Sequence, residues 1–147
     1  MSGVWNLFLS STVRDLGEYR RAVRDACRSK AETACFLSED DWSGGYDDTV
    51  AKCLSRVREA DAFLLLVGHW YGSVPPGYDR SITHIEFDNA LAKWRASQNP
   101  PLAVMMPAHG SLADKKLRAA ASKIPPHLTQ DSRRDDDSST RIEGFAK

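Results

Sequence analysis

The sequence predicts an α/β fold, in which a parallel sheet of four to five strands has helices on both faces. Four short apolar runs alternate with four helical segments along the 147 residues, a pattern typical of β-α-β units. Residues 62–67 (AFLLLV) are an unbroken apolar run, which suits a strand buried on both faces. Together these features predict a three-layer domain with its strands in flavodoxin-like order.

The expected strands are short apolar runs bounded by polar or turn-forming residues. They cover residues 4–9, 32–37, 62–67 and 102–106. A loop and a helical segment follow each strand, and the expected helices cover residues 14–29, 49–59, 82–96 and 112–121. We expect an aspartate, Asp47 or Asp48, to cap the second helix.

The first expected helix has an apolar face and a basic face. Apolar residues recur at helical spacing: Leu16, Tyr19, Ala22, Val23, Ala26 and Cys27. Four arginines fall largely outside this stripe: Arg20, Arg21, Arg24 and Arg28. We interpret the arginine-rich face as solvated, with binding of a polyphosphate or of a partner as the alternative.

The chain is expected to form one folded domain, residues 1–125, followed by a polar segment, residues 126–147. Residues 131–140 (DSRRDDDSST) are low in complexity, which favours a flexible loop. Residues 141–147 contain Ile142 and Phe145 and indicate the start of a further element. We therefore expect either a piece of a longer protein or a loosely docked end.

Composition narrows the classes of function. The chain has 20 basic and 20 acidic residues, and this zero net charge argues against nucleic acid as a partner. No apolar run approaches the roughly 20 residues of a membrane span, and the N-terminus lacks the basic start of a signal peptide. Three cysteines without CxxC spacing and four dispersed histidines predict free thiols, a cytoplasmic location and no metal site.

Glu86 is the first candidate for chemistry. It lies near the start of the third expected helix, close to the carboxyl ends of the strands, where α/β proteins bind ligands. A carboxylate there could hold a ribose hydroxyl, stabilise an oxocarbenium-like centre or act as a nucleophile at a sugar carbon. Thr83 and Glu86 also have the spacing of a capping box. On local spacing alone, this capping role is the simpler interpretation.

Two loops supply further candidates. A hydroxyl-rich loop before the first helix can hold phosphate through backbone amides and side-chain OH groups, and helix capping is the alternative. Its candidate residues are Ser10, Ser11 and Thr12, with Arg14 adding charge. The third strand is followed by His69, Trp70 and Tyr71. An aromatic side chain at this carboxyl end could stack on a planar base.

Two stretches resemble the motifs of a known family. FLSSTVRDL (residues 8–16), followed by Tyr19 and Arg20, resembles its FISSTFxDLxxER opening. GHWYGSVPPG (residues 68–77) and SITHIEF (residues 81–87) resemble its GxRYGSxPPGxxxSxTExEY block. The family is a TIR-like domain of unknown function, found at the N-termini of signalling NTPases of the NACHT and related STAND classes, often followed by repeats.

The resemblance implies a flavodoxin-like (TIR-like) fold related to TIR domains and nucleoside deoxyribosyltransferases. In both relatives a glutamate after the third strand serves chemistry at a nucleoside C1′ carbon, and Glu86 corresponds to it. The resemblance also implies that the loop after the first strand lines a nucleotide pocket, and that Gly72 and Ser81 of the second motif contribute to it. Trp70 stands where the family usually has Arg, and His84 where it often has the first Glu.

The leading hypothesis is a domain of a defence or signalling protein that binds a nucleotide and cleaves its N-glycosidic bond. NAD is the first expected substrate, and no cofactor is expected. A homo-oligomer and a larger parent chain with an NTPase and repeats are the expected partners. One alternative is a non-catalytic interaction or oligomerisation module. The other is base exchange of the nucleoside deoxyribosyltransferase type.

Overall fold

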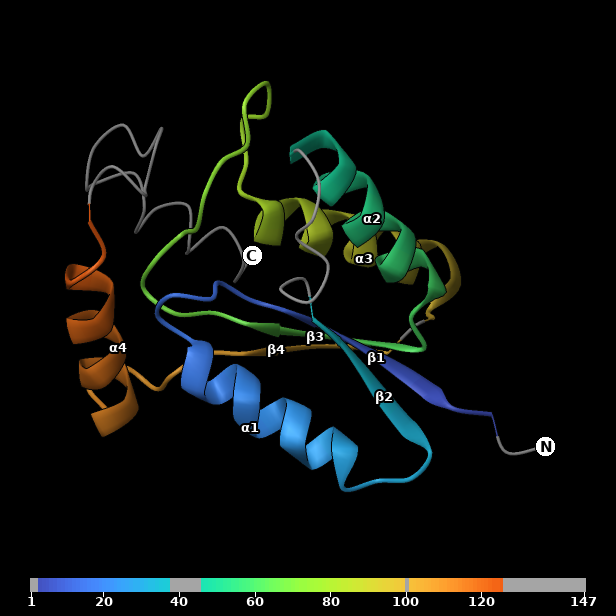
Figure 1. Ribbon diagram of the computed structural model, residues 1–147, viewed down its shortest axis with the longest axis horizontal. Helices are drawn as coiled ribbons and strands as arrows, with labels where there is room; N and C mark the ends of the chain where they lie inside the picture. Colours follow the sequence, from blue (N-terminus) through green and yellow to red (C-terminus); the bar gives the residue numbers. More distant parts are fainter. Residues whose placement is uncertain (1–2, 38–45, 100, 126–147) are drawn as a thin grey trace.

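The computed structural model describes residues 3–37, 46–99 and 101–125, which form a three-layer α/β fold (Figure 1). The expectations for residues 126–147 lie outside the described residues. None of the helices in the described part of the chain is long and apolar enough to cross a membrane.

Four parallel strands form the central sheet. They are β1 (Trp5–Ser10), β2 (Thr33–Leu37), β3 (Ala62–Leu66) and β4 (Leu102–Met105). Their order is β2-β1-β3-β4, so the first strand in the chain lies between the second and the third. This result confirms the predicted parallel sheet in flavodoxin-like order.

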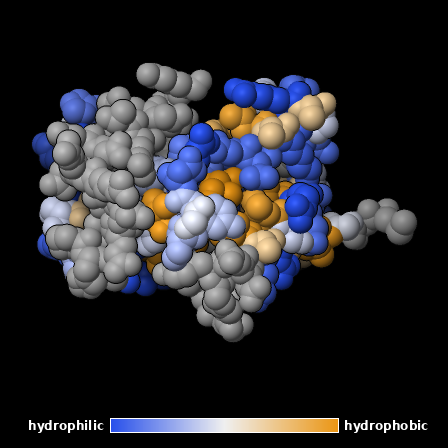
Figure 2. Space-filling model, turned by 90° about the horizontal axis from the view of Figure 1, so that it is seen from above, coloured by the Kyte–Doolittle hydropathy of each residue, from blue (hydrophilic) through white to orange (hydrophobic). Residues whose placement is uncertain are grey.

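The helices cover both faces of the sheet. They are α1 (Gly17–Arg28), α2 (Tyr46–Glu59), α3 (Ile82–Ser97) and α4 (Leu112–Ser122). Figure 1 shows α1 below the sheet and both α2 and α3 above it. In the view from above, the coloured part of that upper face shows hydrophobic surface near the centre with hydrophilic surface beside it (Figure 2).

Side chains along the central strands β1 and β3 point alternately to the two faces of the sheet, so the core has two layers. Phe8 and Phe63 face α2 and α3, and their rings stack with centroids 5.6 Å apart. Leu9 and Leu66 face the other way and pack with Leu117 of α4. Because successive strand residues point to opposite faces, both faces of β1 and β3 must be apolar. This requirement explains the continuous apolar run in β3.

The inward face of α1 differs from the predicted one. The inward residues of α1 and its N-cap are spaced by four, three and four positions: Leu16, Arg20, Val23 and Cys27. Arg20 is only 1% exposed. Tyr19, which was predicted to be in the apolar stripe, is 39% exposed. The prediction that Arg20 lies on a solvated face was therefore wrong, because the helix turns this side chain toward the carboxyl end of β1.

Two helix starts also differ from prediction. α1 begins at Gly17 rather than at residue 14, because the preceding residues form a hydrogen-bonded loop. α2 begins at Tyr46, so Asp47 and Asp48 lie inside the helix and neither is its N-cap. The predicted aspartate cap was wrong.

The start of α4 is tied to the end of β3 by Asp114. Ser111 Oγ accepts a hydrogen bond from Asp114 N (3.1 Å), and Asp114 Oδ2 accepts one from Gly110 N (2.9 Å). His69 Nε2 donates to Asp114 Oδ1 at 2.5 Å. The Gly110 amide, then His69 and Arg118, hold the pKa of Asp114 at about 2, below its ordinary value of 3.8.

We predict that Asp114→Asn lowers the melting temperature at neutral pH. The wild-type carboxylate stabilises the fold fully above its ordinary pKa of 3.8, and this contribution is lost as the pH falls toward about 2. The stability gap between wild type and variant should therefore close in acid, which thermal melts at stepped pH would measure. Asp25→Asn, at an exposed carboxylate of α1, is the control; an equal effect there would contradict the role of Asp114.

Candidate functional site

A small open pocket of about 60 Å³ lies at the carboxyl end of the sheet. Three segments line it: the connection after β1, the loop after β3 and the first turns of α3. Among the sequence-predicted site residues, the pocket brings together Ser11, Thr12, Trp70, Gly72 and Glu86. These residues come from segments far apart in the sequence, so the fold itself assembles the pocket.

Glu86 lies in the second turn of α3 and does not cap this helix. The N-cap is Ser81, whose Oγ accepts a hydrogen bond from the backbone N of His84 (3.2 Å). Thr83 lies inside the helix, so the predicted capping box between Thr83 and Glu86 was wrong. Ser81 takes the capping position because α3 starts at Ile82. Helix capping, the simpler interpretation of Glu86, therefore does not apply.

The carboxyl group of Glu86 is buried and incompletely bonded. Its side chain is almost wholly inaccessible, at 2% exposure, although the residue lines the pocket. Its Oε2 has no hydrogen-bond partner among the residues that the structure describes. A buried carboxyl oxygen without a hydrogen-bond partner destabilises the folded state. Native proteins retain few such atoms, and a catalytic role is one reason for retaining one.

Burial raises the pKa of Glu86 from 4.5 to about 7. The Ser10 hydroxyl, the positive charge of Arg20 and the Cys53 thiol act in the opposite direction. Ser10 Oγ is close enough to lower the pKa, although no hydrogen bond of good geometry reaches this hydroxyl within the described residues. Near neutral pH the group therefore exchanges readily between its acid and carboxylate forms.

The loop after β1 is held by its own side chains. Ser11 Oγ donates to the Thr12 carbonyl (3.0 Å), and Thr12 Oγ1 donates to Asp15 Oδ1. Arg20 donates through NH1 to the Ser11 carbonyl (3.0 Å) and to Ser11 Oγ (2.6 Å). The pocket wall made by Ser11 and Thr12 is therefore held in place by hydrogen bonds to Asp15 and Arg20.

Asp15 joins this loop to the one after β3. Its Oδ2 accepts a hydrogen bond from the backbone N of Trp70 (3.3 Å). Burial raises the pKa of Asp15, and the hydrogen bonds from Thr12 and from backbone amides oppose this effect. The same oxygen lies so close to Gly68 that a Cβ there would meet it at 2.3 Å. Gly68 is therefore required for the close approach of the two loops.

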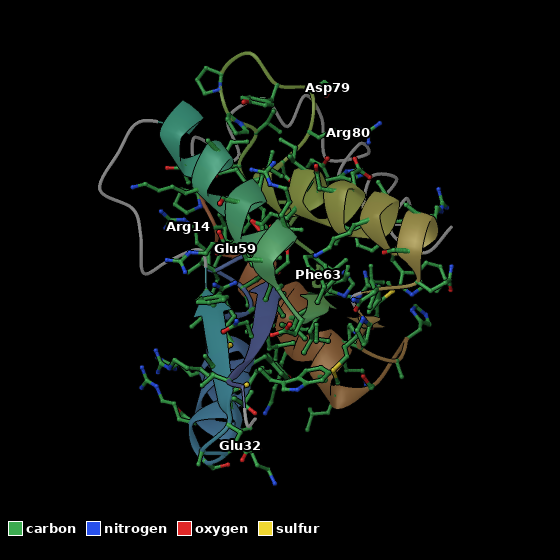
Figure 3. The ribbon with its side chains drawn as sticks, turned by 90° about the vertical axis from the view of Figure 1, so that its right-hand side faces the viewer. Arg14, Glu32, Glu59, Phe63, Asp79 and Arg80 are labelled. Atoms are coloured by element: carbon green, nitrogen blue, oxygen red, sulfur yellow. The ribbon has the colours of Figure 1, made fainter. Side chains whose placement is uncertain are left out.

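Other predicted site residues lie outside the pocket lining. Arg14 is exposed beside the carboxyl end of the sheet (Figure 3). Ser10 lies behind the pocket, against Glu86, and His69 binds Asp114. Tyr71 is buried and bonds through its hydroxyl to His84 Nδ1 (2.7 Å) and to Ser81 N (3.2 Å), so its ring packs in the core while its hydroxyl supports the start of α3.

Sequence reasoning missed Asp15 and Arg20 as parts of the site. The three-residue spacing of Thr12 and Asp15 was a signal for a local side-chain bond. The register of Arg20 with Leu16 and Val23 placed it on the inner side of α1. Within the described residues, no group of three or more His, Cys, Asp or Glu side chains could hold a metal ion.

A family model described as a domain of unknown function (DUF4062) matches residues 6–143 of the chain. The chain belongs to this family. The match extends beyond both sequence motifs at either end. No curated protein matches this DUF4062 domain in sequence.

Among solved structures, the DUF4062 domain is similar to a 2-desoxiribosyltransferase from Leishmania mexicana. The TM-score is 0.51 and the sequence identity 15%, and the alignment covers 95% of this chain and 97% of the other. At this identity the likeness shows a shared fold, and it agrees with the predicted relation to nucleoside deoxyribosyltransferase-like folds.

We predict that Gly68→Ala destabilises the domain by about 1–3 kcal/mol, because the new methyl group displaces the Asp15 carboxylate from Thr12 and Trp70. Urea unfolding would measure the loss. Gly17→Ala is the matched control, since a Cβ there meets nothing within 4 Å and alanine favours helix. In an Asp15→Ala background the cost should shrink; an unchanged cost would contradict the explanation.

Proposed function

We propose that this domain binds a nucleoside or nucleotide and breaks its N-glycosidic bond, with Glu86 as the catalytic residue and NAD as the first substrate to test. The observation that carries the proposal is the Glu86 carboxyl group, which is buried at a pocket, lacks a partner for Oε2 among the described residues and titrates near neutrality. Carboxyl groups with these properties are typical of catalytic acids, bases and nucleophiles.

The chemistry follows from the position of this carboxylate. As the bond from C1′ to the base breaks, the base leaves with the electron pair and positive charge develops on the sugar. The Glu86 carboxylate stabilises this charge or forms a bond to C1′. Water then adds to C1′ and loses a proton, which leaves a hydroxyl group on the sugar. Where Glu86 has bonded to C1′, this attack breaks that bond and the electron pair returns to the carboxylate. The departed base gains a proton where its charge requires one.

Transfer to a second base is the other candidate, and the shared fold with a 2-desoxiribosyltransferase favours it. In that reaction a free base takes the place of water at C1′. The two reactions share the first step and the same carboxylate. They differ in the acceptor, so adding a free base to the assay separates them.

A role in a defence or signalling protein is part of the proposal and is supported by the two sequence motifs. A purely structural interaction module is the competing explanation. It gives no reason for Glu86 to be buried with an Oε2 that lacks a hydrogen-bond partner among the described residues. Because Ser81 caps α3, Glu86 is not needed as a cap either.

Incubation of concentrated protein, with a crowding agent, tests the function. The substrates are NAD, NADP, ATP and deoxynucleosides, with and without a free acceptor base, and chromatography measures the released base. We expect release that is abolished by Glu86→Ala and that rises with pH to a plateau above about 7, because the carboxylate is the active form. Absence of release from folded wild-type protein would favour the interaction module.

We predict that Glu86→Gln stabilises the domain above neutral pH. Because the folded pKa of about 7 exceeds 4.5, the folded state binds more protons in this window, and wild-type stability falls as pH rises through it. The variant avoids this loss and should gain up to about 3 kcal/mol at about pH 8.5, and almost nothing at about pH 4.5.

Urea unfolding at stepped pH would measure this gain. The exposed Glu18→Gln on α1 is the control and should show no such pH dependence. An equal gain in the free energy of unfolding for Glu86→Gln at about pH 4.5 and at about pH 8.5 would contradict the raised pKa of Glu86.

A further inference from the structure

Arg20 is a buried cation whose contacts lead to the pocket. It projects from α1 and is 1% exposed, which is rare for arginine unless its charge is compensated. NH1 donates to both the carbonyl and the hydroxyl oxygen of Ser11. Ser11 in turn lines the same pocket as Glu86. Arg20 therefore lies directly behind one wall of the candidate site.

Arg20 and Glu86 come from opposite sides of the sheet. α1 lies below the sheet and α3 above it (Figure 1), and the end of β1 separates the two helices. Near Glu86, β1 contributes the Ser10 hydroxyl, α1 the Arg20 charge and α2 the Cys53 thiol. Of these three groups, Arg20 is the one with a permanent positive charge.

We propose that Arg20 is a positioning residue for the reaction: held by Ser11, its guanidinium keeps a fixed positive charge behind the Glu86 carboxyl group, so that the buried carboxylate is available to the substrate. This inference rests on the proposed function. It identifies Arg20 as the positive charge that balances the Glu86 carboxylate. It also gives Arg20 a second role, which is to hold Ser11 in the wall of the pocket.

The arrangement solves a specific electrostatic problem. A carboxyl group in an apolar site tends to stay protonated, which would remove the charge needed at C1′. A cation presented from behind favours the charged form without filling the pocket. Because the guanidinium is fixed by two hydrogen bonds to Ser11, it needs no reorganisation when positive charge develops on the sugar.

Two substitutions separate charge from packing. Arg20→Gln keeps a donor for Ser11 and removes the charge, whereas Arg20→Lys keeps the charge and loses the planar fork. Arg21→Gln, at an exposed position of the same helix, is the matched control. Each substitution is made alone and in combination with Glu86→Gln. The stability gap is the difference in free energy of unfolding between the protein with Glu86→Gln and the same protein without it. This gap is measured at stepped pH in the absence of substrate.

The gap widens above the ordinary pKa of 4.5 and levels off at the pKa of Glu86 in the folded protein, so the pH at which it levels off reports that pKa. We expect this pH to be near 7 in wild type and in the Arg21→Gln background, to change little with Arg20→Lys, and to increase by about one pH unit or more with Arg20→Gln. An unchanged levelling-off pH with Arg20→Gln overturns the proposal. Equal shifts with Gln and Lys also overturn it, because packing alone would then explain them.

Where Arg20→Gln does not fold, the uncharged Arg20→Met takes its place in the comparison with Arg20→Lys, and the same two outcomes overturn the proposal. The titration needs no substrate, so its failure is distinguishable from a failure of base release. If base release is observed, its pH profile should shift in step with the pH at which the stability gap levels off in each folded variant.

Discussion

The hydrogen bonds of Asp15 hold together the two loops on which the pocket depends. One carboxyl oxygen accepts from Thr12 and the other from the backbone of Trp70. These loops follow the neighbouring strands β1 and β3, which are paired as far as Ser10 and Leu65, and Asp15 joins the loops beyond the end of that pairing. Gly68 leaves the room that the carboxylate needs. The positions of Ser11 and Thr12 relative to Trp70 thus follow from one buried acid and one missing side chain.

The fold could be predicted from sequence because its signals are local. Each strand is a short apolar run, each helix has its own stripe, and their alternation leaves few topologies. The site could be predicted only in part. Glu86 was found as a candidate, but its local spacing favoured a cap. That ambiguity disappears only when the start of α3 at Ile82 is known.

Arg20 shows why the remaining part was missed, although its register with Leu16 and Val23 was a signal for an inward position. Arginine in a helix is normally solvent-exposed, and no local pattern reports that the end of β1 offers oxygen acceptors. The residues that carry the opening motif, Ser11, Thr12, Asp15 and Arg20, bond chiefly to one another. The opening motif therefore specifies the hydrogen bonds that hold the loop after β1. The identity of a ligand depends on the side chains that this loop leaves accessible.

The central position of β1 also affects how the chain folds. This first strand pairs with β3, and Asn6 N bonds to Asp61 Oδ2 across a sequence separation of 55 residues. Contacts this distant close a large loop and slow the search for the native state. During synthesis β1 must wait, with one edge unpaired, until β3 has left the ribosome. Its short length limits the opportunity for pairing with other chains in that interval.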